Sequence, residues 1–440
     1  MEKNALDLKV ENEGENVILS YEKKDIPDFV PEPVMPPFPY FAPYIRFAEK
    51  YPLKDIAAEL KKRIAPAVKF DEKMKADLEK IIKDKKTKRE KAIAIYGHLA
   101  TNIKHAYVEA SIDGYRPTPA DVIYREKYAS DYDRTVLLYA FMKEAGLSCD
   151  ICFGYNENYA PFDRDFFTIY DLPNILLECE GEYLFAEGEY YPYGIVPQRY
   201  LDNKYFKVFE YSGEMLEISR RKSERSYVDK ILDINVEASG KTSFVMRETG
   251  YGEEDPEIRA SFKNAKPIKR KQAFEGIASG IAKGGTLSGY FLSDVENHSE
   301  RANYKIEFES SNYVSKLGDM YMLVPIPYSS MSTRIVAKEK RNYDMFFDTY
   351  DLDSISVNIK IPEGYKVKYL PKSVEDAGEF YKVSMKISHD LKKNEIKYVR
   401  SNEILKKLVP AKDFDKLKTQ YEKAGLLKKE RIILERSDAK

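Results

Sequence analysis

The sequence predicts an α+β fold, in which a helical segment and a few strands are followed by a long β-rich region. Apolar residues recur at helical spacing over residues 53–104. Strand-like runs begin at residue 148, directly after a strongly apolar helix. From about residue 232, apolar and polar residues alternate with a period of two, which is typical of half-buried strands in an antiparallel sheet or sandwich.

Length and charge restrict the class of protein. A chain of 440 residues is too long for one compact core, so more than one domain is expected. The formal net charge is −1 with acids and bases interspersed, which gives no footprint for binding nucleic acid. The basic run over residues 266–271 is short and predicts a solvated helix start. No apolar run is long enough to span a bilayer as a transmembrane segment.

We divide the chain into three segments. Residues 1–35 are expected to hold two short strands within residues 6–21 and the start of a Pro-rich connector that lies against a surface. Residues 36–212 are expected to form the α+β domain. Residues 213–440 are expected to form the β-rich C-terminal region.

Helix caps can be assigned from the sequence. Asp71 is expected to cap a second helix, and Thr87 with Glu90 forms a capping box for a third. Thr118 is expected to be the N-cap of a short helix with Pro119 at its first position.

The stretch YASDYDRTVLLYAFMKEAGL, residues 128–147, predicts a central helix. Ser130 or Asp131 would cap it and Gly146 would end it. Because it is apolar nearly all round, it should be buried. Strands should follow over residues 148–155, 166–170, 174–179 and 182–186.

In the C-terminal region one helix is expected at about residues 269–283. Another should begin after Pro410 and stop at Gly425. A last strand over residues 431–434 should close the sheet.

The three cysteines offer little chemistry. Cys149 and Cys152 form a CxxC, but they lie in an expected strand that points them to opposite faces, and no second CxxC completes a zinc site. Cys179 is expected in a strand core. No cysteine stands at a helix N-terminus, where the dipole lowers a thiol pKa. The four histidines, at positions 98, 105, 298 and 389, leave a Cys/His pair in space open.

Two other patterns are weaker. The glycines over residues 276–290 do not match a phosphate-binding loop and indicate a helix end followed by a turn. Asp131 and Glu187 could converge as two catalytic carboxylates, but acids are common and nothing in the sequence pairs them. No cofactor is expected.

Several segments resemble a known family. GYRPTPADVIYREKYASDYDRTVLLYAFMKEAGL, SCDICFGYN and DLPNILLECEGEYLFAEGEY follow the order of a strand, short helix, turn, buried helix and later strands in the transglutaminase-like domain of the papain-like cysteine fold. The resemblance covers residues 42–205. SVNIKIPEGYKVKYLPKSVE and LVPAKDFDKLKTQYEKA resemble the closing β domain of bacterial proteins in which that core lies between β-rich domains of unknown function. The N-terminal strands then look like the tail of the first β domain.

The family's catalytic residues are not retained. The resemblance implies Cys at the start of the buried helix, His on the next-but-one strand and Asp after it. Those positions hold Asp131, Asn174 and Glu187, or Ala186 for the last if the alignment shifts by one. Asp133 matches the acid two residues after the nucleophile.

A low-pKa carboxylate is a poor nucleophile and an amide cannot shuttle a proton, so acyl transfer is not expected. We expect a pseudoenzyme with a binding or scaffolding role for a peptide, a protein or a cell-envelope component. Tyr128, Tyr132 and Asp133 are candidate residues of its residual cleft.

The alternative is a hydrolase or acyltransferase with a non-standard site. It would use a shifted cysteine, or the acids Asp131, Asp133 and Glu187 around a divalent cation. The resemblance implies a periplasmic protein if the chain is a fragment, whereas a true start at Met1, which begins no signal peptide, implies the cytoplasm.

Overall fold

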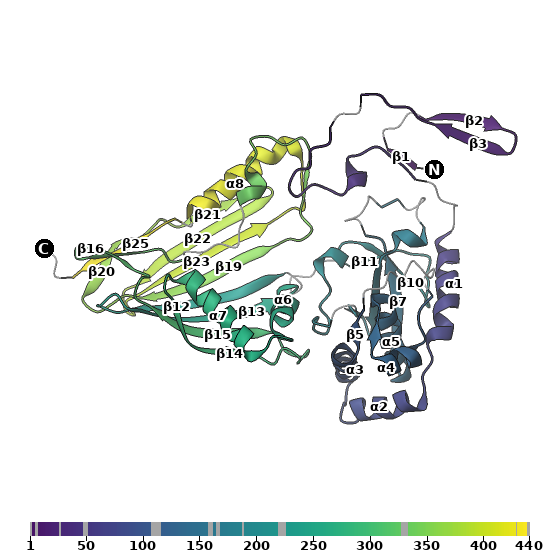
Figure 1. The fold of residues 1–440 in the computed structure, drawn as a ribbon, viewed down its shortest axis with the longest axis horizontal. Helices are drawn as coiled ribbons and strands as arrows, with labels where there is room; N and C mark the ends of the chain where they lie inside the picture. The colour runs from purple at the N-terminus through teal and green to yellow at the C-terminus, as the bar shows by residue number, and fades with distance from the viewer. Residues whose placement is uncertain are drawn as a thin grey trace.

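The computed structural model describes residues 2–4, 8–25, 28–46, 52–106, 116–156, 162–163, 168–186, 189–218, 226–326, 333–427 and 429–437. Its fold is mixed α/β, with several antiparallel sheets. A helical domain with a small sheet stands beside an elongated β-rich domain (Figure 1).

Five helices build the helical domain: α1 (Leu53–Ile64), α2 (Glu72–Ile82), α3 (Lys88–Asn102), α4 (Ala120–Glu126) and α5 (Asp131–Glu144). The expected caps of α2 and α3 are confirmed. The Asp71 carboxylate accepts a hydrogen bond from Met74 N at 2.8 Å. Thr87 and Glu90 form both bonds of a capping box.

The predicted cap of α4 is wrong by one residue. Pro119, not Thr118, is the N-cap, with φ −57° and ψ 137°. Proline has no N–H and its φ is fixed, so it ends the extended segment without needing a side-chain cap. The backbone N–H of Thr118 instead donates to Asp133 Oδ1 at 2.8 Å.

Both predicted ends of α5 are confirmed. Ser130 is the N-cap, and its hydroxyl accepts a hydrogen bond from Asp133 N at 3.2 Å. At the other end Gly146 adopts a φ of 75°. Gly146 N bonds to Lys143 O and Leu147 N to Met142 O, which is a Schellman motif. The helix is buried along ten of its fourteen residues, as its apolar sequence predicts.

The helical domain has a five-stranded antiparallel sheet of order β11-β10-β7-β8-β9. Its strands are β7 (Cys149–Gly154), β8 (Asn174–Cys179), β9 (Glu182–Leu184), β10 (Lys204–Lys207) and β11 (Leu216–Glu217). Strand β11 lies beyond residue 212, the expected end of this domain. The strand predicted over residues 166–170 is wrong where it is described, because Ile169–Asp171 is a 3₁₀ turn; residues 166–167 lie outside the described residues.

The main sheet of the β-rich domain has eight strands in the order β14-β15-β13-β12-β19-β23-β22-β21. They are β12 (Tyr227–Val236), β13 (Thr242–Tyr251), β14 (Thr286–Leu292), β15 (Asn303–Ser310), β19 (Leu352–Lys360), β21 (Val374–Ala377), β22 (Tyr381–Asp390) and β23 (Glu395–Ile404). The alternation predicted these strands, but not that β12 and β19 pair in parallel. That pairing joins the β12–β13 hairpin to a strand that is far from it in sequence.

A second sheet has the order β16-β17-β25-β20, with β16 (Ser315–Leu317), β17 (Met320–Leu323), β20 (Tyr365–Tyr369) and β25 (Ile432–Arg436). We expected the last strand to close the main sheet, but β25 belongs to this second sheet instead. Its buried Ile432 and Leu434 nevertheless belong to the same hydrophobic core as the inner face of the eight strands.

Three helices cover the β-rich domain: α6 (Glu254–Phe262), α7 (Pro267–Ile281) and α8 (Phe414–Leu427). α6 was not predicted from the sequence and lies at the end of the sheet that faces the helical domain (Figure 1). α8 continues past Gly425, where we expected it to stop, because Leu427 is buried in the core. The basic run at residues 266–271 is a helix start, as predicted.

The N-terminal segment includes the predicted hairpin, β2 (Lys9–Glu13) with β3 (Asn16–Ser20), and a pairing of β1 (Glu2–Asn4) with β4 (Tyr44–Arg46). The Pro-rich connector lies against the β-rich domain beside β18 (Met345–Phe346), which pairs with β24 (Leu408–Val409). Glu32 is buried there and forms ion pairs with Lys338 at 3.0 Å and Arg341 at 3.5 Å.

Candidate functional site

The N-terminus of α5 carries an imidazole–carboxylate pair. Nε2 of His105 contacts Oδ1 of Asp131. His105 ends β5 (Lys104–His105), which pairs in parallel with β6 (Tyr128–Ala129), the strand that leads into α5. This pairing brings residues of two distant segments together. Both side chains are about one third exposed, at 34% for His105 and 38% for Asp131, although the contacting oxygen, Asp131 Oδ1, is itself buried.

The pKa of Asp131 is higher in this environment than that of a free Asp side chain. Burial raises the pKa of Asp131, and the attraction of His105, with smaller effects from Arg134 and Arg199, opposes that rise. Burial also raises the pKa of Asp133, although hydrogen bonds from Thr118 and Ser130 oppose it. Asp133 is thus used in the backbone hydrogen bonds of the turn.

Asn174 lies at the start of β8, where the resembled family has His. It is buried, and both ends of its amide are hydrogen-bonded. Oδ1 accepts from Asn156 Nδ2 at 3.2 Å, and Nδ2 donates to Tyr155 O at 3.4 Å and to the Tyr205 hydroxyl at 3.3 Å. Tyr205 in turn donates to Tyr200 O at 2.6 Å. The amide is a structural link between β8 and β10 and has no proton to transfer.

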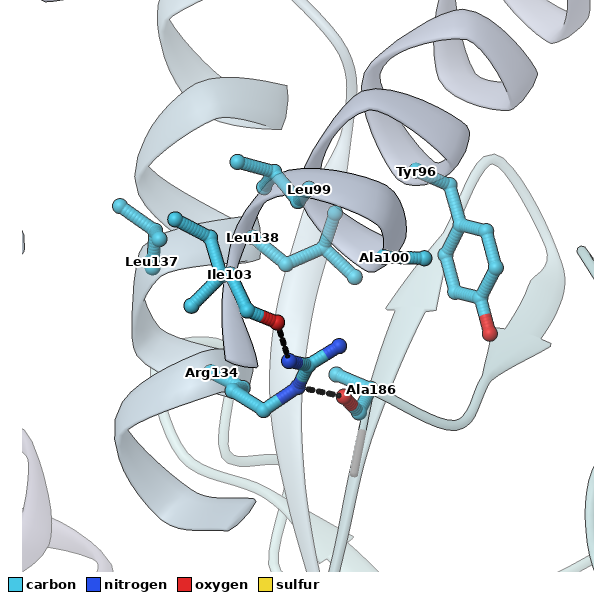
Figure 2. Close-up of a pocket in the computed structure, with 8 residues that line it drawn as sticks. All are labelled: Tyr96, Leu99, Ala100, Ile103, Arg134, Leu137, Leu138 and Ala186. Atoms are coloured by element: carbon cyan, nitrogen blue, oxygen red, sulfur yellow. Dashed lines mark hydrogen bonds between the residues drawn. The ribbon is translucent and has the colours of Figure 1, made fainter. Parts of the chain in front are cut away.

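Arg134 holds three parts of the site together. Its Nε donates to Ala186 O at 2.7 Å and its Nη1 donates to Ile103 O (Figure 2). These carbonyls belong to the segment before His105 and the segment after β9. The guanidinium borders a cavity of only about 10 Å³, lined mainly by apolar residues of α3 and α5. A volume of this size holds at most one water, so it is not a ligand pocket.

A further acid contacts the segment that carries His105. Glu189 Oε1 accepts a hydrogen bond from the backbone N of His105 at 2.6 Å, and its Oε2 lies 3.7 Å from Lys104 Nζ. Lys263 of the β-rich domain lies 4.0 Å from the same oxygen. Glu187, the predicted acid, lies outside the described residues.

The candidate cleft residues have different environments. Tyr128 is 57% exposed and lies opposite Lys104 in the β5–β6 pairing, one position before the residue opposite His105. Tyr132, which we expected at a cleft, is instead buried, and its ring lies edge-on to Phe153 with centroids 5.7 Å apart. Asp131 and Tyr132 are consecutive residues of α5, and successive side chains point about 100° apart around a helix, so one is partly exposed and the next is buried.

The cysteines lie in the sheet, on opposite sides of β7 as predicted. Cys152 is buried in one core cluster. Cys149 packs against another core cluster and lies opposite Cys179 of the neighbouring strand β8. Burial raises the pKa of Cys152. A hydrogen bond with Cys149, and burial, raise that of Cys179. Neither group is an activated thiol.

Two other histidines have structural partners. His98 Nε2 lies 3.1 Å from the Tyr124 hydroxyl, and His298 Nδ1 lies 3.0 Å from Tyr191 O. Within the described residues, no group of three or more His, Cys, Asp or Glu side chains is placed to hold a metal ion. None of the described helices is long and apolar enough to cross a membrane.

Sequence reasoning found the helix and Asp131 but missed His105 as the partner of Asp131, and Glu189 as the acid that accepts a hydrogen bond from the His105 backbone. The only signal for His105 was that it is one of four histidines. Its contact with Asp131 depends on the pairing of two-residue strands, which leaves no periodic pattern in the sequence.

Comparison with known proteins gives two matches. Residues 319–434 match a domain of unknown function with a solved structure, DUF3858. The whole fold is similar to the crystal structure of a "putative protease" from Parabacteroides distasonis, with a TM-score of 0.62 and 14% identity over 98% of this chain and 68% of that chain. At that identity the likeness is one of fold. It is compatible with a transglutaminase-like core. No curated protein matches the chain.

Proposed function

We propose that residues 36–212 form a transglutaminase-like domain of the papain-like cysteine fold that has no nucleophile, and that the protein binds or scaffolds other molecules without catalysis. The ligand would be a peptide, a protein or a cell-envelope component that contacts the exposed end of α5. The C-terminal region would be a β-sandwich-like partner domain. The fold of the Parabacteroides protein supports the first part of this proposal.

One observation is the main support for the absence of catalysis in this proposal. The helix N-terminus that would activate a thiol presents Asp131, and its carboxylate is engaged by His105. A carboxylate attacks an amide poorly, and the acyl intermediate would be an anhydride. The expected His position is filled by a buried amide, Asn174, whose hydrogen bonds are all satisfied internally.

The exposed groups support recognition at the same place. Tyr128 offers an aromatic face with a polar tip, which is common in binding surfaces. The partly exposed side chains of His105 and Asp131, near the same strand pair, can donate and accept hydrogen bonds.

The His105–Asp131 pair also supports a second candidate, a hydrolase. A carboxylate that orients an imidazole is the arrangement of a general base, and Nδ1 of His105 would be left to activate water. This candidate also needs hydrogen-bond donors placed to stabilise an oxyanion beside the pair.

An experiment separates the two. An unstructured peptide library and isolated cell-wall material are incubated with the wild type and with His105→Ala, Tyr128→Ala and the distant control Asp233→Asn. Bound material is measured by pull-down and cleavage by mass spectrometry. Binding that Tyr128→Ala weakens, without cleavage, supports the binding role. Cleavage that His105→Ala abolishes and Asp233→Asn leaves intact refutes it in favour of the hydrolase.

A further inference from the structure

A row of polar side chains crosses the inner face of the eight-stranded sheet at one end. Most inward positions of these strands are apolar. On the same face, five positions are instead charged or amide residues: Lys230 of β12, Glu248 of β13, Asp353 of β19, and Arg400 and Asn402 of β23. We call these five residues the polar row. Period-two alternation predicts apolar residues there, so the row needs an explanation other than packing.

A cavity of about 340 Å³ lies over the polar row. Its size is within the range of small-molecule sites, about 300–1,000 Å³. Sheet, helix and loop all contribute to its wall, which includes Lys230, Asp353, Asn402, Glu254 at the start of α6, Asp351, and the rings of Tyr381 and Tyr421.

Asn402 is the residue that points to a ligand. It is only 3% exposed, yet neither Nδ2 nor Oδ1 has a hydrogen-bond partner. Asp353 Oδ2 has no hydrogen-bond partner either, although Arg400 Nη2 forms an ion pair with it at 3.6 Å. Buried polar groups are normally hydrogen-bonded, so the amide of Asn402 and the carboxylate oxygen of Asp353, which has an ion pair but no hydrogen bond, are suited to an external hydrogen-bonding partner.

The charges of the cavity wall select the sign of that partner. Three carboxylates, those of Glu254, Asp351 and Asp353, line it with one ammonium group, that of Lys230. The buried guanidinium of Arg400 is also ion-paired with Asp353, so the three acids still outnumber the two neighbouring cations. Lys230 Nζ lies 3.9 Å from Asp353 Oδ1. Burial raises the pKa of Glu254, and Lys230 opposes that rise. A positive ligand would offset the mutual repulsion of the acids.

The remaining wall is aromatic. The rings of Tyr381 and Tyr421 lie with centroids 4.3 Å apart, on the side of the cavity formed by β22 and α8. Ring faces attract an organic cation and pack against its carbon skeleton.

We propose that this cavity binds a small organic ammonium ion that carries a hydroxyl or carbonyl oxygen close to its amine, the chemistry shared by an amino sugar and an amino acid amide. The ammonium group donates to the carboxylates of Asp353, Asp351 and Glu254. The neighbouring oxygen accepts from Asn402 Nδ2, and Asn402 Oδ1 takes a further N–H or O–H of the ligand. This site is separate from the His105–Asp131 pair and does not depend on its function.

Isothermal titration calorimetry on the full chain tests this proposal. The probes are glucosamine and alaninamide, each with an uncharged analogue, glucose and N-acetylalaninamide, at about pH 6.5, below the pKa of an α-amino group. At least one ammonium probe should bind saturably, and its analogue at least tenfold more weakly. The stronger of the two ammonium probes identifies the source. If neither binds at millimolar concentration, or the uncharged analogues bind equally well, the proposal is wrong.

Two variants locate the site. Asp353→Asn keeps the shape of the side chain and should weaken ammonium binding at least tenfold. Asp233 pairs with Arg247 and does not line the cavity, so the control Asp233→Asn should leave ammonium binding unchanged. Asn402→Leu should abolish binding yet raise the thermal midpoint by about 2–4 °C, because it removes an unpaired buried amide. Unchanged binding in both Asp353→Asn and Asn402→Leu would overturn the assignment even if the wild type binds.

Discussion

Arg134 is predicted to be the residue on which the geometry around Asp131 depends most. Arg134 is 5% exposed, and its guanidinium donates charged hydrogen bonds to the carbonyls of Ile103 and Ala186. The substitution Arg134→Met keeps the length of the side chain and removes both donors. Each hydrogen bond from a charged group contributes about 1.5–3 kcal/mol, so two lost bonds cost about 3–6 kcal/mol. Part is recovered because a buried charge no longer has to be desolvated, which leaves a net loss of about 3 kcal/mol.

Urea unfolding measures this loss. The chain has no Trp, so far-UV circular dichroism is the signal for the transition of the helical domain. Arg125→Met is the matched control, since the side chain of Arg125 is 66% exposed on α4 and forms an ion pair with the neighbouring Glu126. It should change stability by less than about 0.5 kcal/mol. A loss below about 1 kcal/mol for Arg134→Met, or a loss equal to that of the control, would refute the view that Arg134 holds the site together.

Three further predictions follow from charged groups. Asp131→Cys should place a thiol at a helix N-terminus beside His105; iodoacetamide at about pH 6 should label it at least tenfold faster than in Asp131→Cys with His105→Ala, and equal rates would count against this. Although burial raises it, hydrogen bonds from Lys338 and from backbone amides keep the pKa of Glu32 below its usual value. Glu32→Gln should therefore cost about 2–3 kcal/mol at neutral pH, and the difference from wild type should shrink as pH falls below about 4; a constant difference would contradict the ion pairs. Burial lowers the pKa of His298 to about 4. Its protonation on unfolding should thus destabilise the wild type by up to about 3 kcal/mol between about pH 6.5 and 4, and His298→Phe should lack this dependence.

The sequence predicted correctly those features that depend on interactions between residues close together in the chain. The caps at Asp71 and Thr87 and the C-terminal turn at Gly146 depend on residues within one helical turn, and all were predicted correctly. The error at Thr118 arose because its backbone bonds to Asp133, fifteen residues away in sequence. Likewise, α8 passes Gly425 because Leu427 gains burial in a core that the local sequence does not reveal.

Long-range pairings could not be read from alternation. The alternation of β12 and β19 fixed which residues face inward, but not that these strands are parallel neighbours. Strand neighbours depend on the whole sheet, since one apolar face packs as well beside several partners. The same limit explains β25, whose pattern predicted a strand but not its sheet.

The contact between Asp131 and His105 could not be predicted from the sequence for the same reason. From the sequence, Asp131 was an acid in the place of a thiol, and nothing indicated what engages it. The structure supplies His105 from a strand that precedes it by more than twenty residues, and this changes the argument against catalysis. Without His105, Asp131 would be an isolated acid at a helix start, stabilised by the dipole. With His105, the helix end keeps an imidazole in reach of the nucleophile position, so a single substitution to Cys would restore two of the requirements for an activated thiol. Under the proposed function, the identity of residue 131 therefore separates this protein from a catalyst more than any change in its fold does.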